Sequence, residues 1–248
     1  RGTKAVQDVK DYCGGEAAVE LVVIDVSNDE SVKSAAESLK AKDVKLDAIV
    51  NNAGTGLAHD VDDSQMINVN YRGVKRVVDS FVPLLDPSKT TRIINVGSGA
   101  GPNYVSTQPD ERKRLMCNPD ITLEQIEEIA SVGYLPDDPA HSNNFVGGAY
   151  GLSKALCYDY TMYTAKSLAE KNIVSMCLTP GFLATNIVPE EYKGMAKPVE
   201  EGTIAIKHCL FQTSMENNGW YYGSDAKRSP PYFMRNPGEP EYDGKLPW

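Results

Sequence analysis

The sequence predicts an α/β fold built on a doubly wound parallel sheet. From residue 19 onward, short apolar runs alternate with longer segments of helical period, which is typical of repeated βα units. The chain has 248 residues, of which 41% are hydrophobic, and 25 Lys and Arg against 34 Asp and Glu give a net charge of −9. A soluble chain of this size buries enough surface to fold without disulfides or a metal. We therefore expect a single domain over residues 1–248.

Each predicted element follows from a local pattern. Continuous apolar runs, such as the one at 19–26, predict strands that are buried on both faces. Ser27 with Glu30 three residues later predicts a capping box, and Pro198 is expected in the first turn of another helix. The expected strands are 19–26, 46–50, 91–96, 173–178 and 219–222, and the expected helices are one that begins at 27 and those over 64–85, 149–171 and 198–211.

Two segments interrupt this alternation. Residues 101–144 have no strand pattern, but Thr122 and Gln125 predict a short helix, so we expect an ordered insertion that packs over one edge of the domain. The tail over 229–248 contains five of the fifteen prolines, and we expect it to run extended.

Composition argues against several classes of function. The acidic balance, with no cluster of Lys and Arg, argues against a nucleic acid or an anionic membrane surface as partner. No apolar run approaches the ~18 residues that a membrane span requires. The five cysteines are scattered and the three histidines lack metal-ligand spacing, which predicts reduced thiols in a cytoplasmic compartment and no metal site.

Tyr150 and Lys154 form the first candidate pair. They are four residues apart at the start of a predicted helix, so their side chains project from one face, one turn apart. An ammonium near a phenol favours the phenolate and lowers a pKa that starts near ~10, which makes Tyr150 a candidate general acid. The alternative is that this spacing arises by chance on a helix.

Further polar and glycine-containing motifs follow the predicted strands. They are Asn51 to Gly54, Gly97 to Gly99 and Pro180 to Thr185, with Asn70 in a following helix. The carboxyl ends of parallel strands meet at one edge of an open α/β sheet, where such sheets bind their ligands. The motifs therefore place the candidate site at this edge.

Together with the Tyr/Lys pair, the order and spacing of these motifs resemble the short-chain dehydrogenase/reductase family over residues 1–228. The resemblance implies a Rossmann-type sheet and hydride transfer to a carbonyl. It implies that Tyr150 protonates the carbonyl oxygen and that Ser98 hydrogen-bonds the same oxygen. Lys154 would hold the nicotinamide ribose, and Asn70 would position a water that relays protons to Lys154.

The resemblance also implies the contacts of the cofactor. Asp25 would accept from the adenine amino group with Val26 beside it, and Thr185 would contact the carboxamide or the pyrophosphate. The other implied contacts are Asn52, Ala53, Gly54, Tyr150, Lys154, Pro180, Gly181 and Leu183. Structural alternatives remain open: Asp25 as a strand end, Thr185 as a cap, and the segment 51–54 as a brace of the central strand.

Ser98 and Tyr150 are 52 residues apart because the insertion lies between them. This length resembles the carbonyl reductase branch of the family, in which the extra segment covers a helix surface that other members use to oligomerise. We therefore expect a monomer. The insertion is also expected to wall the substrate side, with a purely structural lid as the alternative.

One family feature is absent from the 248 residues. Family members begin with a strand, a Thr-Gly-x-x-x-Gly-x-Gly loop and a helix whose backbone N–H groups hold the pyrophosphate, whereas the early glycines here are Gly2, Gly14 and Gly15. We expect about 35 to 40 residues, the length of such a βαβ start, to be missing ahead of Arg1. A truncated chain of this kind would bind cofactor poorly, unless a partner or a rearranged element replaces the strand.

Arg1 aligns with the position just after the second strand of the fold. A guanidinium there suits the 2′-phosphate of NADP, so NADP(H) is favoured over NAD, unless an acidic residue precedes Arg1 or Arg1 is a plain chain end. The sequence thus predicts an NADPH-dependent reductase of a ketone, aldehyde or quinone. The alternative is a nonenzymatic or inactive protein of the same fold that binds a nucleotide weakly or acts as a regulator.

Overall fold

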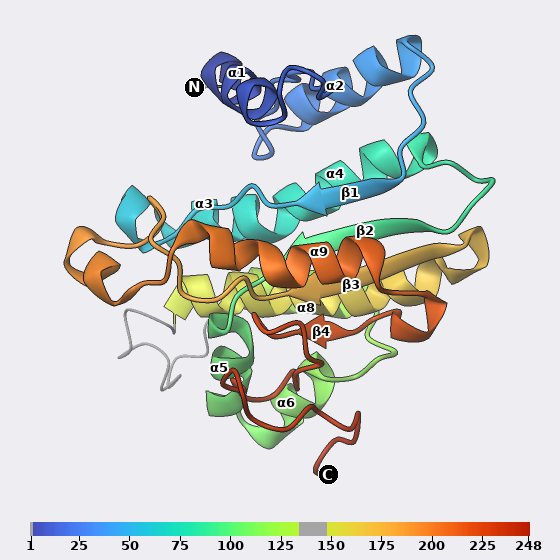
Figure 1. The fold of residues 1–248 in the computed structure, drawn as a ribbon. Helices are drawn as coiled ribbons and strands as arrows, with labels where there is room; N and C mark the ends of the chain where they lie inside the picture. Colours follow the sequence, from blue (N-terminus) through green and yellow to red (C-terminus); the bar gives the residue numbers. More distant parts are fainter. Residues whose placement is uncertain (1, 134–147) are drawn as a thin grey trace.

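The computed structural model describes residues 2–133 and 148–248 and contains a four-stranded parallel sheet in the order β1-β2-β3-β4 (Figure 1). The register pairs Ile49 with Ile93 and Ile93 with Ser175. The strands are β1 (Ala48–Asn51), β2 (Thr91–Val96), β3 (Ile173–Leu178) and β4 (Tyr221–Tyr222). The predicted α/β class with a parallel sheet is confirmed.

Helices flank the sheet on both faces. The helices of the described residues are α1 (Gly2–Tyr12), α2 (Asp29–Ala41), α3 (Asp63–Ile67), α4 (Gly73–Phe81), α5 (Ala100–Thr107), α6 (Asp110–Met116), α7 (Leu123–Val132), α8 (Gly148–Ser167) and α9 (Thr203–Phe211). Short 3₁₀ segments lie at Leu57–His59, Val82–Leu84, Ala169–Lys171, Glu190–Met195, Val199–Gly202 and Met215–Asn217. α1 is not among the helices that the sequence predicts.

The central strands are buried because helices cover both of their faces. Ile93 of β2 belongs to the same core cluster as Leu156 of α8, whereas its neighbour Ile94 belongs to a second cluster with Cys209 of α9. Successive strand residues point to opposite faces, so α8 and α9 lie on opposite sides of the sheet (Figure 1). All six residues of β3 are buried, as expected for a parallel sheet covered on both faces.

The predicted strand at 19–26 is wrong. Residues 16–25 run without helix or strand, and Val23 is 81% exposed, while Val22 and Ile24 pack partly against the core. A strand needs a neighbour that accepts its backbone hydrogen bonds. Within the described residues β1 pairs only with β2, so this segment has no neighbouring strand to pair with.

The capping box predicted at Ser27 is also wrong. α2 begins at Asp29, and its N-cap is Asn28, whose side chain accepts the backbone N–H of Ser31 at 2.9 Å. The hydroxyl of Ser27 instead donates to Asp25 at 2.6 Å. Asn caps a helix as well as Ser does, so the helix begins one residue later than the sequence predicts.

The helix predicted over 64–85 is present and contains one widened turn. α3 begins after a capping box formed by Asp62 and Gln65, and residues 68–72 form a π-helical turn that leads into α4. π turns are rare and often occur at functional sites. Asn70 lies in the middle of this turn and is 1% exposed.

The insertion over 101–144 is helical as far as it is described. α7 begins with the predicted capping box of Thr122 and Gln125. Helices α5, α6 and α7 all contact α8, and the first two lie below the sheet in Figure 1. The remainder of the insertion, 134–147, lies outside the described residues.

The tail over 229–248 contains neither helix nor strand, as predicted. Arg235, 8% exposed, binds the carboxylate of Asp225 and the hydroxyl of Ser229. Leu246 packs against the core cluster that contains α8. The tail therefore runs extended but is anchored to the rest of the molecule by buried contacts.

Candidate active site

A cavity of about 490 Å³ opens at the carboxyl ends of β1, β2 and β3. Asn52 and Gly54 line it after β1, Ser98 lines it after β2, and Gly181 lines it after β3. Parallel strands end at this edge of the sheet, which is where open α/β sheets bind ligands. The edge that the sequence predicts for the site therefore contains a cavity of ligand size.

Tyr150 and Lys154 both line this cavity, one turn apart near the start of α8. Lys154 is 7% exposed, and its Nζ donates to the carbonyl oxygen of Val96, the last residue of β2, at 3.0 Å. The same Nζ lies 5.9 Å from the centroid of the Tyr150 ring. Because a strand carbonyl fixes the ammonium, its positive charge stays close to the phenol and is partly shielded from water, which strengthens electrostatic interactions.

Ser98 lines the cavity from the end of β2. The preceding Gly97 extends the ladder, because its N–H donates to the carbonyl of Leu178 at 2.7 Å. A Cβ at position 97 would lie 2.8 Å from the Sγ of Cys177, so glycine permits this close approach to β3. The Oγ of Ser98 accepts the N–H of Ala100 at 3.2 Å, which leaves its own O–H available as a donor.

Asn70 is not among the residues that line the cavity; it braces the wall behind Gly54. Its Nδ2 donates to the carbonyl of Thr55 at 2.9 Å and to the Oγ of Ser153 at 3.0 Å, and its Oδ1 accepts the N–H of Thr55 at 2.9 Å. Both amide hydrogens are therefore used inside the protein. Asn70 ties the loop after β1 to α8, and its implied role toward a relaying water stays a prediction.

Two glycines keep the space next to the Tyr/Lys pair open. A Cβ at Gly54 would lie 3.2 Å from the Oδ1 of Asn70 and 3.6 Å from the Nζ of Lys154. A Cβ at Gly56 would lie 2.6 Å from the Cγ1 of Ile187 and 3.3 Å from the Tyr150 ring. A side chain at either position would press on these groups, so glycine preserves the free volume beside them.

The motif after β3 supplies the opposite wall. Pro180, Gly181, Leu183 and Thr185, all implied by the resemblance, line the cavity. Gly181 has a φ of +94°, a conformation that favours glycine, and this turn directs the chain away from β3 and along the cavity.

Three of the implied cofactor contacts that the structure describes, Asp25, Val26 and Ala53, do not line the cavity. Asp25 is exposed, and its carboxylate accepts the hydroxyl and the backbone N–H of Ser27, which hold its pKa below the usual value. Asp25 ends the unpaired segment, so no ladder aligns it with the strand ends. Val26 packs against α4, Ala53 is exposed outside the lining, and Arg1 lies outside the described residues.

The sequence reasoning missed an apolar wall and a histidine. His59 lines the cavity, and its Nδ1 is 2.9 Å from the Oγ1 of Thr55. The first residues of this wall directly follow the Pro180 motif in the sequence, so that motif could have predicted them. No local sequence pattern indicates His59. The apolar residues of this wall are Phe182, Ile187, Val188, Pro189, Val199 and Ile206.

The described residues show no metal-binding cluster. No group of three or more His, Cys, Asp and Glu among them is arranged to hold a metal ion. None of the helices in the described part of the chain is long and apolar enough to cross a membrane.

Known proteins resemble this chain in sequence and in fold. The profile of the family described as short chain dehydrogenase matches residues 1–109. A (+)-neomenthol dehydrogenase from Arabidopsis thaliana is 28% identical over 232 residues, which cover 82% of this chain and 76% of that protein. The structure of salutaridine reductase from Papaver somniferum matches with a TM-score of 0.68 and 23% identity, over 89% of this chain and 87% of that one.

A second structure, the NADPH-bound carbonyl reductase from chicken fatty liver, matches with a TM-score of 0.62 and 20% identity, over 90% of this chain and 82% of that one. At these identities the structural matches establish the fold alone. The sequence matches point to the same family as the motifs do, and the residues that carry the resemblance, Ser98, Tyr150 and Lys154, all line one cavity. Together, the profile match and the sequence relatives support a member of the short-chain dehydrogenase/reductase family, of the carbonyl reductase-like kind.

Proposed function

We propose that this protein is an NADPH-dependent reductase that converts the carbonyl of a ketone, aldehyde or quinone into an alcohol. The observation that carries the proposal is the cavity into which the end of β2 and the start of α8 bring Ser98, Tyr150 and Lys154. Membership of an oxidoreductase family supports the reaction class.

The residues present fit the nicotinamide ribose end of a dinucleotide. Gly54 leaves free space beside the Nζ of Lys154, which a Cβ would enter. Lys154 has three N–H donors, and among the described residues only the carbonyl of Val96 accepts from it, so two donors can bond to ribose hydroxyls. We infer that Lys154 and Gly54 hold the ribose and that Thr185, with the turn at Gly181, holds the carboxamide. The bound nicotinamide supplies the hydride.

In this mechanism the chain provides the proton and stabilises the charge. Tyr150 donates its phenolic proton to the carbonyl oxygen as the carbon is reduced. Ser98 donates a hydrogen bond to the same oxygen, which stabilises the negative charge that develops there. The ammonium of Lys154, fixed by the end of β2, stabilises the charge that the proton leaves on the phenol oxygen.

The lining favours a neutral, largely apolar substrate. Lys154 is the one charged side chain of the described lining, and its ammonium faces Tyr150 and the implied ribose. The wall from Phe182 to Ile206 is apolar, so an ionised substrate would lose hydration there without gaining a partner. We therefore propose an uncharged carbonyl compound with an apolar body.

The enzyme proposal is tested with a panel of apolar ketones, aldehydes and quinones, at millimolar NADPH, by following the absorbance of NADPH. We expect turnover that falls about 10²- to 10⁴-fold in Tyr150→Phe, the range that a general acid contributes. Tyr163→Phe changes a half-buried tyrosine of the same helix and is expected to retain turnover. Nucleotide binding without turnover of any panel member would instead support the regulatory alternative.

The choice of NADP over NAD rests on Arg1 and stays a proposal. It is tested by the ratio of kcat/KM for NADPH to that for NADH with one substrate. A ratio well above one supports the proposal, and a ratio below one contradicts it.

We also propose a cytoplasmic monomer. Helices α5, α6 and α7 pack on α8 and cover part of the helix surface that this family uses elsewhere for association, as the resemblance implies. Size-exclusion chromatography with light scattering should give a mass near 27.1 kDa. A multiple of this mass would overturn the proposal.

A further inference from the structure

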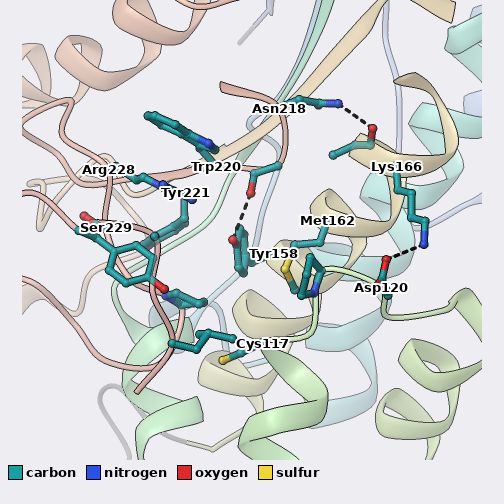
Figure 2. Close-up of a pocket in the computed structure, with 17 residues that line it drawn as sticks. Cys117, Asp120, Tyr158, Met162, Lys166, Asn218, Trp220, Tyr221, Arg228 and Ser229 are labelled. Carbon is teal, nitrogen blue, oxygen red and sulfur yellow. Dashed lines mark hydrogen bonds and ion pairs between the residues drawn. The ribbon is translucent and has the colours of Figure 1, made fainter. Parts of the chain in front are cut away.

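A second cavity, of about 500 Å³, lies beside the other end of α8 and shares no lining residue with the cavity at Tyr150. It is lined by the C-terminal half of α8, the turn after Cys117, the residues around β4, and the tail (Figure 2). This volume is in the range of sites that bind small molecules. The mechanism proposed above does not use it.

The cavity has fixed aromatic walls. The Oη of Tyr158 donates to the carbonyl of Gly219 at 3.1 Å, as Figure 2 shows, and its ring meets the ring of Tyr221 edge to face at 5.5 Å. Trp220 and Tyr242 add two further rings. Aromatic rings held in this way present flat apolar surfaces that suit another ring.

Arg228 brings to these walls a guanidinium that forms no ion pair within the described residues. Its guanidinium carbon lies 4.2 Å from the centroid of the Trp220 ring and 5.3 Å from that of Tyr242. Among the described residues, no acceptor bonds to the guanidinium; the carboxylate of Glu241 accepts the backbone N–H of Arg228 instead, at 3.0 Å. The side chain is thus held by two rings, while its planar set of N–H donors is left for another partner.

The other charged groups of the lining cancel each other. Lys166 and Asp120 form an ion pair at 2.6 Å (Figure 2). Burial raises the pKa of Cys117 to about 12, so this lining thiol stays neutral at physiological pH. Among the charged residues of the lining, Arg228 is therefore the one without an ion-pair partner in the described part of the chain, while the carboxylate of Glu241 lies next to its backbone.

The tail packs closely against Arg228 and restricts the position of its guanidinium. Gly244 has a φ of +86°, and a Cβ there would come within 2.5 Å of the Nη1 of Arg228. Glycine at this position allows the backbone to approach the guanidinium closely. A guanidinium that is already ordered loses less freedom when it binds an anion, which favours affinity.

We propose that this cavity is a binding site for a small flat aromatic carboxylate, whose ring stacks on the walls formed by Tyr158 and Trp220 and whose carboxylate binds Arg228. The pairing is complementary in shape and in charge, because the planar guanidinium fork matches the two oxygens of a carboxylate. The site is distinct from the cavity at Tyr150, and the proposal is independent of the reductase proposal.

The test is a titration with naphthalene-2-carboxylate, followed by the fluorescence of Trp220 in a Trp248→Phe background. We expect saturable binding, and at least tenfold weaker binding of the neutral naphthalene-2-carboxamide, because the amide forms no charge-assisted pair with Arg228. This comparison needs no change at Arg228. Absence of saturable binding at millimolar carboxylate, or equal affinity for acid and amide, would overturn the proposal.

Three variants test in which cavity the ligand binds. Arg228→Gln should weaken carboxylate binding at least tenfold, whereas Lys227→Gln, which removes an exposed neighbouring charge, should leave it within twofold. Lys154→Met distinguishes the two cavities, because it removes the cation beside Tyr150. Binding that is lost in Lys154→Met and kept in Arg228→Gln would assign the carboxylate to the other cavity and overturn the proposal.

Discussion

Helices α8 and α1 differ strongly in how far they are buried and packed against the rest of the molecule. Fourteen of the twenty residues of α8 are buried, and the helix packs on β3 and on the helices of the insertion. None of the residues of α1 is buried, and Tyr12 at its end is 93% exposed. Tyr150 and Lys154, which are proposed to react, therefore lie on the helix that is packed on several sides, and this packing fixes their positions.

The same contrast separates β3 from the segment over 16–25. Both are rich in apolar residues, yet β3 is fully buried between β2 and β4, whereas the segment has no strand partner among the described residues. Apolar composition alone therefore does not make a strand; hydrogen-bonding neighbours are also needed. Four measurements test this difference between well-packed and poorly packed regions.

Hydrogen exchange should show the largest contrast. Amides in a buried ladder exchange only when the structure opens, at a cost that approaches the global free energy of unfolding, whereas amides without a partner are almost unprotected. We expect the amides of Val22 to Ile24 to exchange at least ~10³-fold faster than those of Val174 to Met176, given a typical stability of ~5 kcal/mol or more. Comparable protection in both segments would mean that residues 16–25 are paired in solution.

Lys154→Met tests whether the positive charge of Lys154 is needed for proton transfer by Tyr150. Loss of the ammonium removes the group that stabilises the Tyr150 oxygen, so kcat/KM for carbonyl reduction should fall about 10²- to 10⁴-fold, as when a proton-transfer group is impaired. The matched control is Lys166→Met, which changes an exposed lysine on the same helix and should keep activity within twofold. Equal losses in both variants would point to a general effect of charge on α8.

Core substitutions compare the two helices directly. Leu156→Ala on α8 removes a fully buried side chain and should lower the free energy of unfolding by about 2–5 kcal/mol. Val9→Ala on α1 changes a residue that is 44% exposed and should stay within about 0.5 kcal/mol. Urea denaturation of both variants measures the two values, and similar losses would contradict the comparison.

The smallest expected effect concerns Asp159 of α8. The residue is 1% exposed, and neither carboxylate oxygen has a hydrogen-bond partner among the described residues, so burial raises its pKa well above 3.8. Because the folded pKa exceeds the unfolded one, the protonated form stabilises the fold at low pH, and this contribution is lost as the pH rises from about 4 through the folded pKa.

Asp159→Asn keeps a neutral side chain at every pH and should therefore raise Tm at pH 7 by about 2–4 °C, the shift that ~1 kcal/mol produces in a chain of this size. At pH 4 its advantage should shrink. Asp110→Asn changes an exposed carboxylate of α6 and serves as the control. A lower Tm for Asp159→Asn at pH 7 would mean that the ionised carboxylate is stabilised in the fold, with Arg112 as its partner.

Sequence reasoning predicted the parts of the fold that depend on local pattern. The strands at 91–96 and 173–178 have the predicted bounds because their apolar runs end abruptly at turn residues. The π turn around Asn70 could not be predicted, because an added residue in a turn depends on what the helix packs against. The failure at 19–26 has a similar cause, since the pattern contains no information about a partner strand.

Some residues of the candidate site could likewise be predicted from local sequence patterns, and others could not. Ser98, Tyr150 and Lys154 follow strand ends or a helical repeat, so their convergence could be predicted from the topology of a parallel sheet. The apolar wall at Ile187 and Ile206 could not, because these residues approach the cavity only after the chain has left β3 and returned. Asn70 shows a third case, in which the residue was found but its side chain bonds to Thr55 and Ser153 rather than lining the cavity.

The transfer of deuterium from NADPH to product tests the proposed hydride transfer at the cavity of Tyr150. A ketone or aldehyde that the panel identifies is reduced with NADPH that carries deuterium at both positions of C4, and the alcohol is examined by mass spectrometry and NMR. Hydride transfer at the cavity of Tyr150 predicts one deuterium on the carbon that bears the hydroxyl, with formation of this product suppressed in Tyr150→Phe. Product that carries solvent hydrogen at that carbon, or product formed equally well by Tyr150→Phe, would contradict the account.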